Sequence, residues 1–310
     1  MPFLQQMACW LPERLVSNDE MGSLLGCAAE WIESVSGIQE RRFAGPDDTT
    51  VSMGTAAAQR CLKELGIGAE SIGYLICSSG TAENRFPGPA TSIASKLGCG
   101  PIPAIDLPLA STGALLGLDL ARNLAPRYGR VLVVATEKMS PVALTEPMER
   151  GVSMLFGDGA GACVVGMEPG PLEIVDSLLA SDGQFAADLM LRAGEPLIMN
   201  GRSVILQASR KIPRVIQDLL ERNGLRASDV ASFVMHQANI NLIQKVAAAL
   251  GVENERFFTN IARYGNTSSA SLLIAAAEWM ENARPMSGEH AVLSVFGAGF
   301  QWGAMLLKAS

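Results

Sequence analysis

Apolar residues along the chain fall into two kinds of run, and their order in the first half repeats in the second. In one kind, apolar residues recur every three or four positions, as in a helix buried along one face. The other kind is short and apolar throughout, as in a strand buried on both faces. The helical pattern covers 49–67, 86–98, 111–125, 201–225, 240–252 and 266–280. The strand pattern lies within 71–81, 102–109, 130–138 and 231–239, and forms two strands around a turn in each of 154–166 and 290–307.

Apolar strands separated by helices predict an α/β fold with a parallel sheet that is covered on both faces. The repeated order predicts two similar halves, residues 1–168 and 169–310, with the boundary in the stretch MEPGPL. The helices over 111–125 and 266–280 are so apolar that we expect them to lie between two sheets.

The composition agrees with large buried layers and argues against several classes of function. Of the 310 residues, 48% are hydrophobic and 18% are charged, which favours a packed core over disorder. The net charge is −7 and no basic stripe is present, so we expect no nucleic-acid binding. No apolar run reaches the roughly 18 residues of a membrane helix, and MPFLQQMACWLPERL lacks the basic start and apolar core of an export signal. We therefore expect a cytoplasmic protein with no membrane association.

The cysteines and histidines indicate neither a disulfide framework nor a metal site. The cysteines are scattered without a C-x-x-C pair, as in proteins whose thiols stay reduced. They are Cys9, Cys27, Cys61, Cys77, Cys99 and Cys163. The two histidines, His236 and His290, lie far apart and lack acidic or cysteine neighbours at ligand spacing, so we expect no metal.

Ser111 lies between a predicted strand and a predicted helix, and this position has two interpretations. Serine is a favoured helix N-cap, which would make Ser111 structural. A serine at a strand-to-helix turn can also be a nucleophile near the positive end of a helix. The stretch L-A-S-T-G lacks the first glycine of the G-x-S-x-G motif, so it does not match a hydrolase elbow.

Three other stretches also have a structural and a functional interpretation. His236 ends a strand in VMHQAN and is either a core histidine with satisfied hydrogen bonds or a catalytic group. Asn266 in GNTSSAS is either a helix cap or a catalytic group, and FGAGFQWG (296–303) is either a tight hairpin or a source of oxyanion-stabilising N–H groups. The stretch GDGAG resembles a dinucleotide loop but leads into a strand, which argues against a Rossmann site.

Taken together, these stretches resemble one family from about residue 8 to 307. WIESVSGIQERRFA, RFPGPATSIASKLG, LFGDGAGACVV, HQAN, YGNTSSAS and FGAGFQWGAML occur in this order. In this respect the chain is similar to the β-ketoacyl-acyl carrier protein synthases III of the thiolase superfamily. The resemblance implies a thiolase-like five-layer αβαβα fold, a homodimer and an active site between the two halves. It also implies acyl-coenzyme A as substrate, an acyl carrier protein as partner, and no cofactor.

The resemblance assigns roles to individual residues. HQAN gives His236, YGNTS gives Asn266, and the nucleophile position falls on Ser111, where the chain reads ASTG and relatives read ACAG. The backbone N–H groups of Ser111 and Ala298 would form an oxyanion hole.

Two further residues receive binding roles by resemblance. Trp31 would pack on the adenine of coenzyme A, and Phe86 would reach into the acyl pocket of the neighbouring subunit. Val35 and Asn241 stand where relatives often carry arginine, which implies a weaker attraction to the phosphates of coenzyme A or to an acidic carrier protein.

Serine at position 111 leaves three hypotheses open. The first is an acyltransferase of this family in which Ser111 carries the acyl group as an oxoester. An oxoester is less activated than a thioester, so transfer to other acceptors is easier than carbon–carbon condensation. The second is an ordinary cysteine-dependent condensing synthase whose cysteine was changed to serine by engineering. The third is a non-catalytic partner subunit that binds acyl groups.

Overall fold

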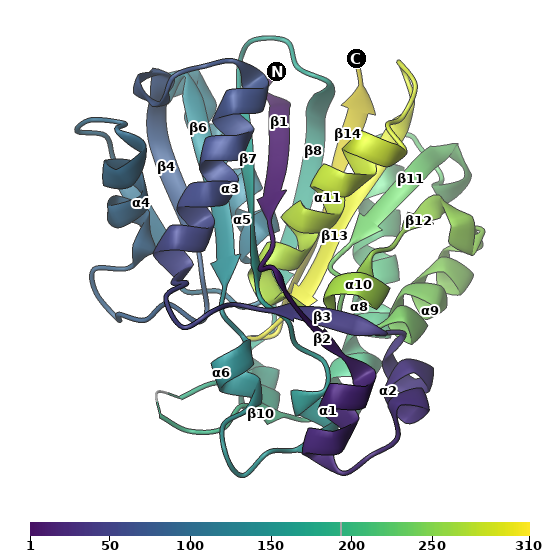
Figure 1. Cartoon of the computed structure of the whole chain (residues 1–310). Coiled ribbons are helices and arrows are strands. Elements are labelled where there is room, and N and C mark those ends of the chain that lie inside the picture. The colour runs from purple at the N-terminus through teal and green to yellow at the C-terminus, as the bar shows by residue number, and fades with distance from the viewer. Residues whose placement is uncertain (193) are drawn as a thin grey trace.

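The computed structural model describes residues 1–192 and 194–310, and a ten-stranded sheet is its main feature (Figure 1). The strands lie in the order β12 (Phe257–Phe258), β11 (Val230–Met235), β13 (His290–Gly297), β14 (Gln301–Ala309), β8 (Leu172–Ser181), β1 (Phe3–Trp10), β7 (Gly159–Gly166), β6 (Arg130–Glu137), β4 (Ile72–Ser78) and β5 (Ala104–Leu107). Two small sheets pair β2 (Arg14–Ser17) with β3 (Glu40–Phe43) and β9 (Leu189–Met190) with β10 (Ile198–Met199).

The helices cover the strands and build a smaller region below the sheet in Figure 1. They are α1 (Asn18–Leu25), α2 (Ala29–Ser36), α3 (Thr50–Leu65), α4 (Pro89–Leu97), α5 (Gly113–Tyr128), α6 (Ser140–Ala143), α7 (Arg150–Ser153), α8 (Gly201–Arg222), α9 (Ile240–Leu250), α10 (Ile261–Tyr264) and α11 (Ser271–Asn282). The 3₁₀ turns are η1 (Ala69–Ser71), η2 (Gly183–Asp188), η3 (Ala227–Asp229), η4 (Asn254–Arg256) and η5 (Ser268–Ala270).

The sheet order is symmetric about its centre. Reading outward, one side runs β1, β7, β6, β4 and β5, and the other runs β8, β14, β13, β11 and β12. The two sides meet where Phe3 pairs with Glu173 and Leu4 with Leu172. The strands of the two sides therefore occupy corresponding positions. The boundary predicted between residues 168 and 169 falls in the stretch between β7 and β8, and the division into halves stays a prediction.

The predicted all-parallel sheet is wrong for the centre of the molecule. Among the strands of the described residues, only the outer pairs β4–β5, β4–β6, β11–β12 and β11–β13 are parallel. The inner strands β6, β7, β1, β8, β14 and β13 pair antiparallel. A strand buried on both faces is apolar in either orientation, so its composition does not reveal its direction.

Three apolar cores give the order of the layers. One core joins α3 and α4 to the first side of the sheet, and another joins α8 and α9 to the second side. The central core contains α5 and α11, the apolar runs 111–125 and 266–280, together with strands of both sides. These sides belong to one continuous ten-stranded sheet and not to the two separate sheets expected. Close approach in this core requires Gly161 of β7, because a Cβ there would lie 2.4 Å from Cβ of Leu273 in α11.

Most predicted helices and strands are confirmed, with three differences. The helix predicted over 266–280 begins only at Ser271, after the 3₁₀ turn η5. The stretch 154–166 contains one strand, β7, and not two, because the residues before it form only an isolated bridge between Phe156 and Asn266. The predicted helix over 86–98 begins only at Pro89, which occupies its first turn, and ends at Leu97 with Gly98 as its C-cap.

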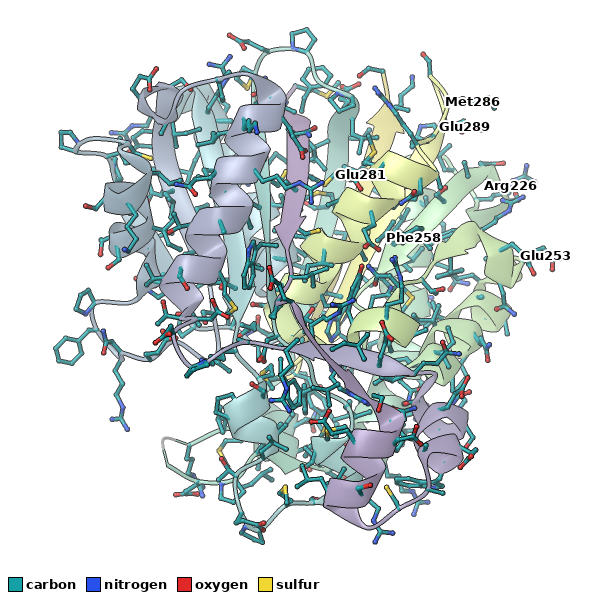
Figure 2. The ribbon with its side chains drawn as sticks, viewed as in Figure 1. Arg226, Glu253, Phe258, Glu281, Met286 and Glu289 are labelled. Carbon is teal, nitrogen blue, oxygen red and sulfur yellow. The ribbon has the colours of Figure 1, made fainter. Side chains whose placement is uncertain are left out.

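On the outer surface, α3 and α11 are linked by an ion pair. A guanidinium nitrogen of Arg60 lies 2.8 Å from a carboxylate oxygen of Glu281, which Figure 2 labels. Both side chains are about half exposed, so the pair adds little stability. In the described part of the chain, no helix is both long and apolar enough to span a membrane.

Candidate active site

Ser111 precedes the first turn of α5 in a left-handed backbone conformation. Its φ is 67°, a region that costs a residue with a side chain roughly 1–2 kcal/mol. The N-cap position of α5 belongs to Thr112, so the interpretation of Ser111 as the N-cap is wrong. The hairpin turn after β13 packs directly against this loop, and a Cβ on Gly297 would lie 2.8 Å from Cβ of Ser111. The backbone thus places the Ser111 side chain where its conformation is fixed by neighbours and not by helix capping.

His236 follows β11, where its backbone N–H donates to the carbonyl of Ser294 at 2.9 Å. The imidazole is buried, and burial lowers the pKa of His236 to about 4. The ring is therefore neutral at pH 7, with one nitrogen that donates and one that accepts. Its buried Nδ1 has no partner within the described residues, so the ring is not a core histidine with satisfied hydrogen bonds.

The side chain of Asn266 is oriented by its own turn. Its Oδ1 accepts the backbone N–H of Ser268 at 2.9 Å, which directs the amide oxygen toward η5. Within the described residues its Nδ2 has no acceptor, so both of its hydrogens can be donated to a ligand. The backbone of Asn266 pairs with Leu155 and Gly157, which joins the motifs LFGDGAG and GNTSSAS. The amide oxygen of Asn266 therefore caps the turn that follows it, close to the structural role considered from the sequence. Its amide nitrogen remains available to a ligand.

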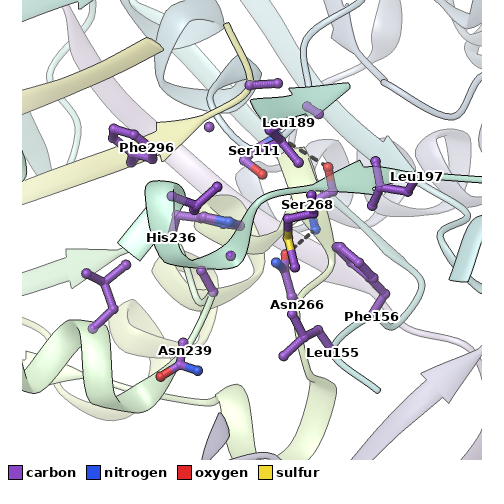
Figure 3. Close-up of a pocket in the computed structure, with 18 of the residues that line it drawn as sticks. Ser111, Leu155, Phe156, Leu189, Leu197, His236, Asn239, Asn266, Ser268 and Phe296 are labelled. Carbon is purple, nitrogen blue, oxygen red and sulfur yellow. Dashed lines mark hydrogen bonds between the residues drawn. The ribbon is translucent and has the colours of Figure 1, made fainter. Parts of the chain in front are cut away.

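Ser111, His236 and Asn266 line one cavity of about 340 Å³ (Figure 3). The wall is mainly apolar and is completed by residues of both halves and of the loops around β9 and β10. Its apolar members include Met154, Leu155, Phe156, Leu189, Met190, Leu197, Met199, Val204, Ile205 and Phe296. The arrangement suits a substrate with an apolar chain and one polar reacting group.

Comparison with known proteins shows the family to which this site belongs. The family model for 3-oxoacyl-[acyl-carrier-protein] synthase III matches residues 105–183, and the model for its C-terminal part matches residues 220–309. The β-ketoacyl-[acyl-carrier-protein] synthase III of Oleidesulfovibrio alaskensis is 34% identical, over 96% of this chain and 96% of the relative. The chain belongs to the β-ketoacyl-[acyl-carrier-protein] synthase III family.

Solved structures of synthase III proteins confirm the thiolase-like five-layer fold. The 3-oxoacyl-[acyl-carrier-protein] synthase III of Aquifex aeolicus aligns with a TM-score of 0.95 and 30% identity, over 99% of this chain and 100% of that chain. The priming β-ketosynthase of the R1128 polyketide biosynthetic pathway aligns with a TM-score of 0.92 and 30% identity, over 100% and 96% of the two chains.

The two backbone groups expected to form the oxyanion hole of the synthase III site differ in their hydrogen bonding. Ala298 lines the cavity, and its N–H donates to no acceptor within 1–192 and 194–310. The N–H of Ser111 already donates to Oγ of Ser268 at 3.2 Å, as the dashed line in Figure 3 marks. An oxyanion would therefore have to share or displace this bond.

The two residues expected to bind substrate lie apart from one another in this single chain. Trp31 of α2 lines the cavity, and 38% of its surface is exposed. A side chain that contacts a ligand at the entrance of the cavity must be exposed in this way. Asn239 supports this region, because its Nδ2 donates to the carbonyl of Val35 at 2.8 Å and its Oδ1 accepts the N–H of Asn241. Phe86 is 85% exposed and does not belong to the cavity wall.

Sequence reasoning missed Ser268 and Glu137. Glu137 is fully buried, which raises the pKa of its carboxyl group, while hydrogen bonds from Ser269, Thr81 and Gly80 act in the opposite direction. The available signal was an acidic residue at the end of the apolar run RVLVVATE. Buried acidic side chains are rare unless they have partners, so a polar cluster at the end of this strand could have been expected, although nothing local identifies Ser268 as a member.

Proposed function

We propose that the chain is an acyltransferase of the synthase III type. It takes an acyl group from acyl-coenzyme A, or from an acyl carrier protein, onto Oγ of Ser111. It then passes the group to a malonyl thioester or to another acceptor in fatty acid or polyketide assembly. The observation that carries this proposal is the presence of Ser111, a neutral His236 and an oriented Asn266 at one apolar cavity.

In the first step, Oγ of Ser111 attacks the thioester carbonyl. A serine hydroxyl needs a general base, and a neutral imidazole is one. The C–O bond of the acyl-serine forms and the C–S bond breaks, while the serine proton passes through His236 to the leaving thiolate, which departs as coenzyme A thiol. Burial lowers the pKa of His236 to about 4, so the protonated ring is short-lived and readily gives the proton to the leaving thiolate.

In the second step, the same two polar side chains hold the acceptor. An N–H of His236 and Nδ2 of Asn266 donate to the thioester oxygen of a malonyl unit, which stabilises the enolate left when carbon dioxide departs. The enolate carbon attacks the acyl-serine carbonyl, the C–C bond forms, the C–O bond to serine breaks, and the serine oxygen takes up a proton from solvent water. An oxoester responds poorly to this attack, so oxygen, nitrogen or sulfur acceptors are the easier alternative.

The retained polar groups favour an enzyme over the other two hypotheses. A subunit that only binds acyl chains has no need of a buried histidine whose Nδ1 is unpaired, because an unpaired polar atom in a core is destabilising. If Ser111 replaces a natural cysteine, the same site performs the condensation through a thioester. The natural codon for residue 111 distinguishes these two cases.

Acyl transfer to Ser111 is tested by intact-protein mass spectrometry after incubation with acyl-coenzyme A. We expect a mass increase of one acyl group, release of coenzyme A thiol, and neither of these in the Ser111→Ala variant. An adduct that persists in Ser111→Ala would place the acylation elsewhere, and the complete absence of adduct in the unmodified chain would contradict the proposal.

A further inference from the structure

A buried carboxylate lies behind the site and reaches it through one hydroxyl group. Glu137 ends β6, is fully buried and does not belong to the cavity wall. Its carboxylate accepts hydrogen bonds from Gly80 and Thr81 in the loop after β4, and from Ser268 and Ser269 in η5. One side chain thus ties the end of β6 to two segments that flank the nucleophile, one from each half.

The direction of each hydrogen bond in this cluster is set by the carboxylate. Oγ of Thr81 and of Ser269 lie 2.5 and 2.6 Å from it, and Oγ of Ser268 lies 3.0 Å away. A hydroxyl group has one hydrogen, and that of Ser268 is donated to Glu137. The Ser268 oxygen therefore offers only lone pairs to its other neighbour, the backbone N–H of Ser111.

Ser111 and Ser268 also share an unusual backbone conformation. Within residues 1–192 and 194–310, they are the two non-glycine residues with positive φ, at 67° and 48°. Such conformations persist only where the surroundings hold them in place. Here a hydrogen bond joins the two residues, and Ser268 makes further hydrogen bonds to Asn266 and Glu137.

We propose that Glu137 is a positioning residue that acts through Ser268 to hold Ser111 in the left-handed conformation required for attack. Glu137 fixes the Ser268 hydroxyl as an acceptor, and that acceptor fixes the Ser111 N–H. The proposal rests on the proposed function, in which Oγ of Ser111 is the nucleophile. Neither Glu137 nor Ser268 takes part in bond making.

Ser268→Ala and Ser269→Ala form a matched pair for the test. Both remove one hydroxyl donor to Glu137, but only Ser268 contacts Ser111. Ser268→Ala also keeps the backbone N–H that orients Asn266. We expect single-turnover acylation at saturating acyl-coenzyme A to fall at least tenfold in Ser268→Ala and less than twofold in Ser269→Ala. The melting temperature should fall to a similar extent in both, because each loses one hydrogen bond to the buried Glu137, and the Kd for coenzyme A should stay close to that of the unmodified chain.

Equal acylation rates in the two variants would overturn the proposal. A loss confined to coenzyme A affinity would overturn it as well, because positioning of the nucleophile changes the rate at saturation.

A second readout separates this inference from the proposed function. In the Ser111→Cys background, iodoacetamide reports the presentation of residue 111 without any acyl transfer. We expect Ser268→Ala to slow alkylation of Cys at this position at least tenfold relative to Ser269→Ala. If acyl-coenzyme A acylates none of the variants but alkylation is still slower in Ser268→Ala than in Ser269→Ala, the proposed function fails and the positioning role stands. If the alkylation rates are equal, the positioning role fails.

The role of Glu137 is tested by asking whether the effects of two substitutions on the acylation rate are additive. Glu137→Gln should lower the acylation rate as Ser268→Ala does, and combining the two should add less than a twofold further loss, because both interrupt one chain of contacts. A further tenfold loss in the double variant would show that Glu137 acts by another route. Should Glu137→Gln fail to fold, the serine pair decides the proposal by itself.

Discussion

The reactivity of residue 111 depends on its atom type as much as on its position. Its side chain is held at the cavity by a left-handed backbone and by the hairpin turn at Gly297, but a hydroxyl group is a weak nucleophile. Ser111→Cys places a more acidic and more nucleophilic atom in nearly the same volume. We expect acylation by acyl-coenzyme A to become at least tenfold faster, and condensation with malonyl-carrier protein to become detectable by product analysis. A thiol variant that forms no adduct would exclude residue 111 as the acylation site.

His236 and Asn266 are expected to act together on the acceptor. Each presents a donor at the cavity, and loss of one oxyanion donor typically slows catalysis 10²- to 10³-fold. His236→Ala and Asn266→Ala should each slow malonyl decarboxylation about 100-fold or more, measured as release of carbon dioxide, with the far-ultraviolet circular dichroism unchanged. A variant that decarboxylates at the original rate removes its residue from the mechanism.

The depressed pKa of His236 also predicts how stability changes with pH. Burial lowers this pKa from 6.5 to about 4, so the unfolded chain binds a proton here at pH values where the folded chain does not. The contribution is fully present above pH 6.5 and is lost as the pH falls toward 4, by about 3 kcal/mol. Urea unfolding of the unmodified chain and of His236→Gln at pH 7 and pH 4.5 measures it. The stability difference between them should shift in favour of the variant at the lower pH, and a constant difference would contradict this account.

At the scale of elements, the central helices depend on close contact with the strands. Gly161→Ala would place a Cβ 2.4 Å from that of Leu273, so β7 and α11 must move apart. Overpacking of this kind costs roughly 1–3 kcal/mol of unfolding free energy. Gly183→Ala is the control, because nothing lies within 4 Å of its added Cβ. Chemical denaturation should show the loss only in the first variant, and equal stabilities would mean that the central layer can adjust.

Patterns of neighbouring residues predicted the helices and strands. They did not predict contacts between residues far apart in the sequence. The helix α3 was readable because Gly66 ends its apolar pattern, and HQAN and YGNTS identified His236 and Asn266. The antiparallel centre was not readable, since pairing depends on strands far apart in the sequence. The contact of Glu137 with Ser268 spans 131 positions and has no local pattern. Serine normally favours caps, so nothing local indicated the left-handed backbone at residue 111.

For the whole molecule, the exposure of Phe86 supports an assembly of two chains. An aromatic ring that is 85% exposed on a loop gains most by burial against a partner, and the family resemblance implies a homodimer. We expect light scattering at micromolar concentration to give the mass of two chains. Phe86→Ala should change the preferred acyl chain length with no change in the Kd for coenzyme A. A stable monomer would exclude this role for Phe86.

The position of β1 between the two halves has a consequence for synthesis on the ribosome. Residues 3–10 are translated long before their partners, which lie at 160–166 in β7 and at 172–173 in β8. Contacts of such long sequence separation form late and slowly. The first half therefore cannot complete its sheet until residue 166 has been translated, and its unpaired strand edges stay exposed until then. Nascent chains of this protein should accordingly rely on chaperones for longer than a domain of the same size built from local contacts.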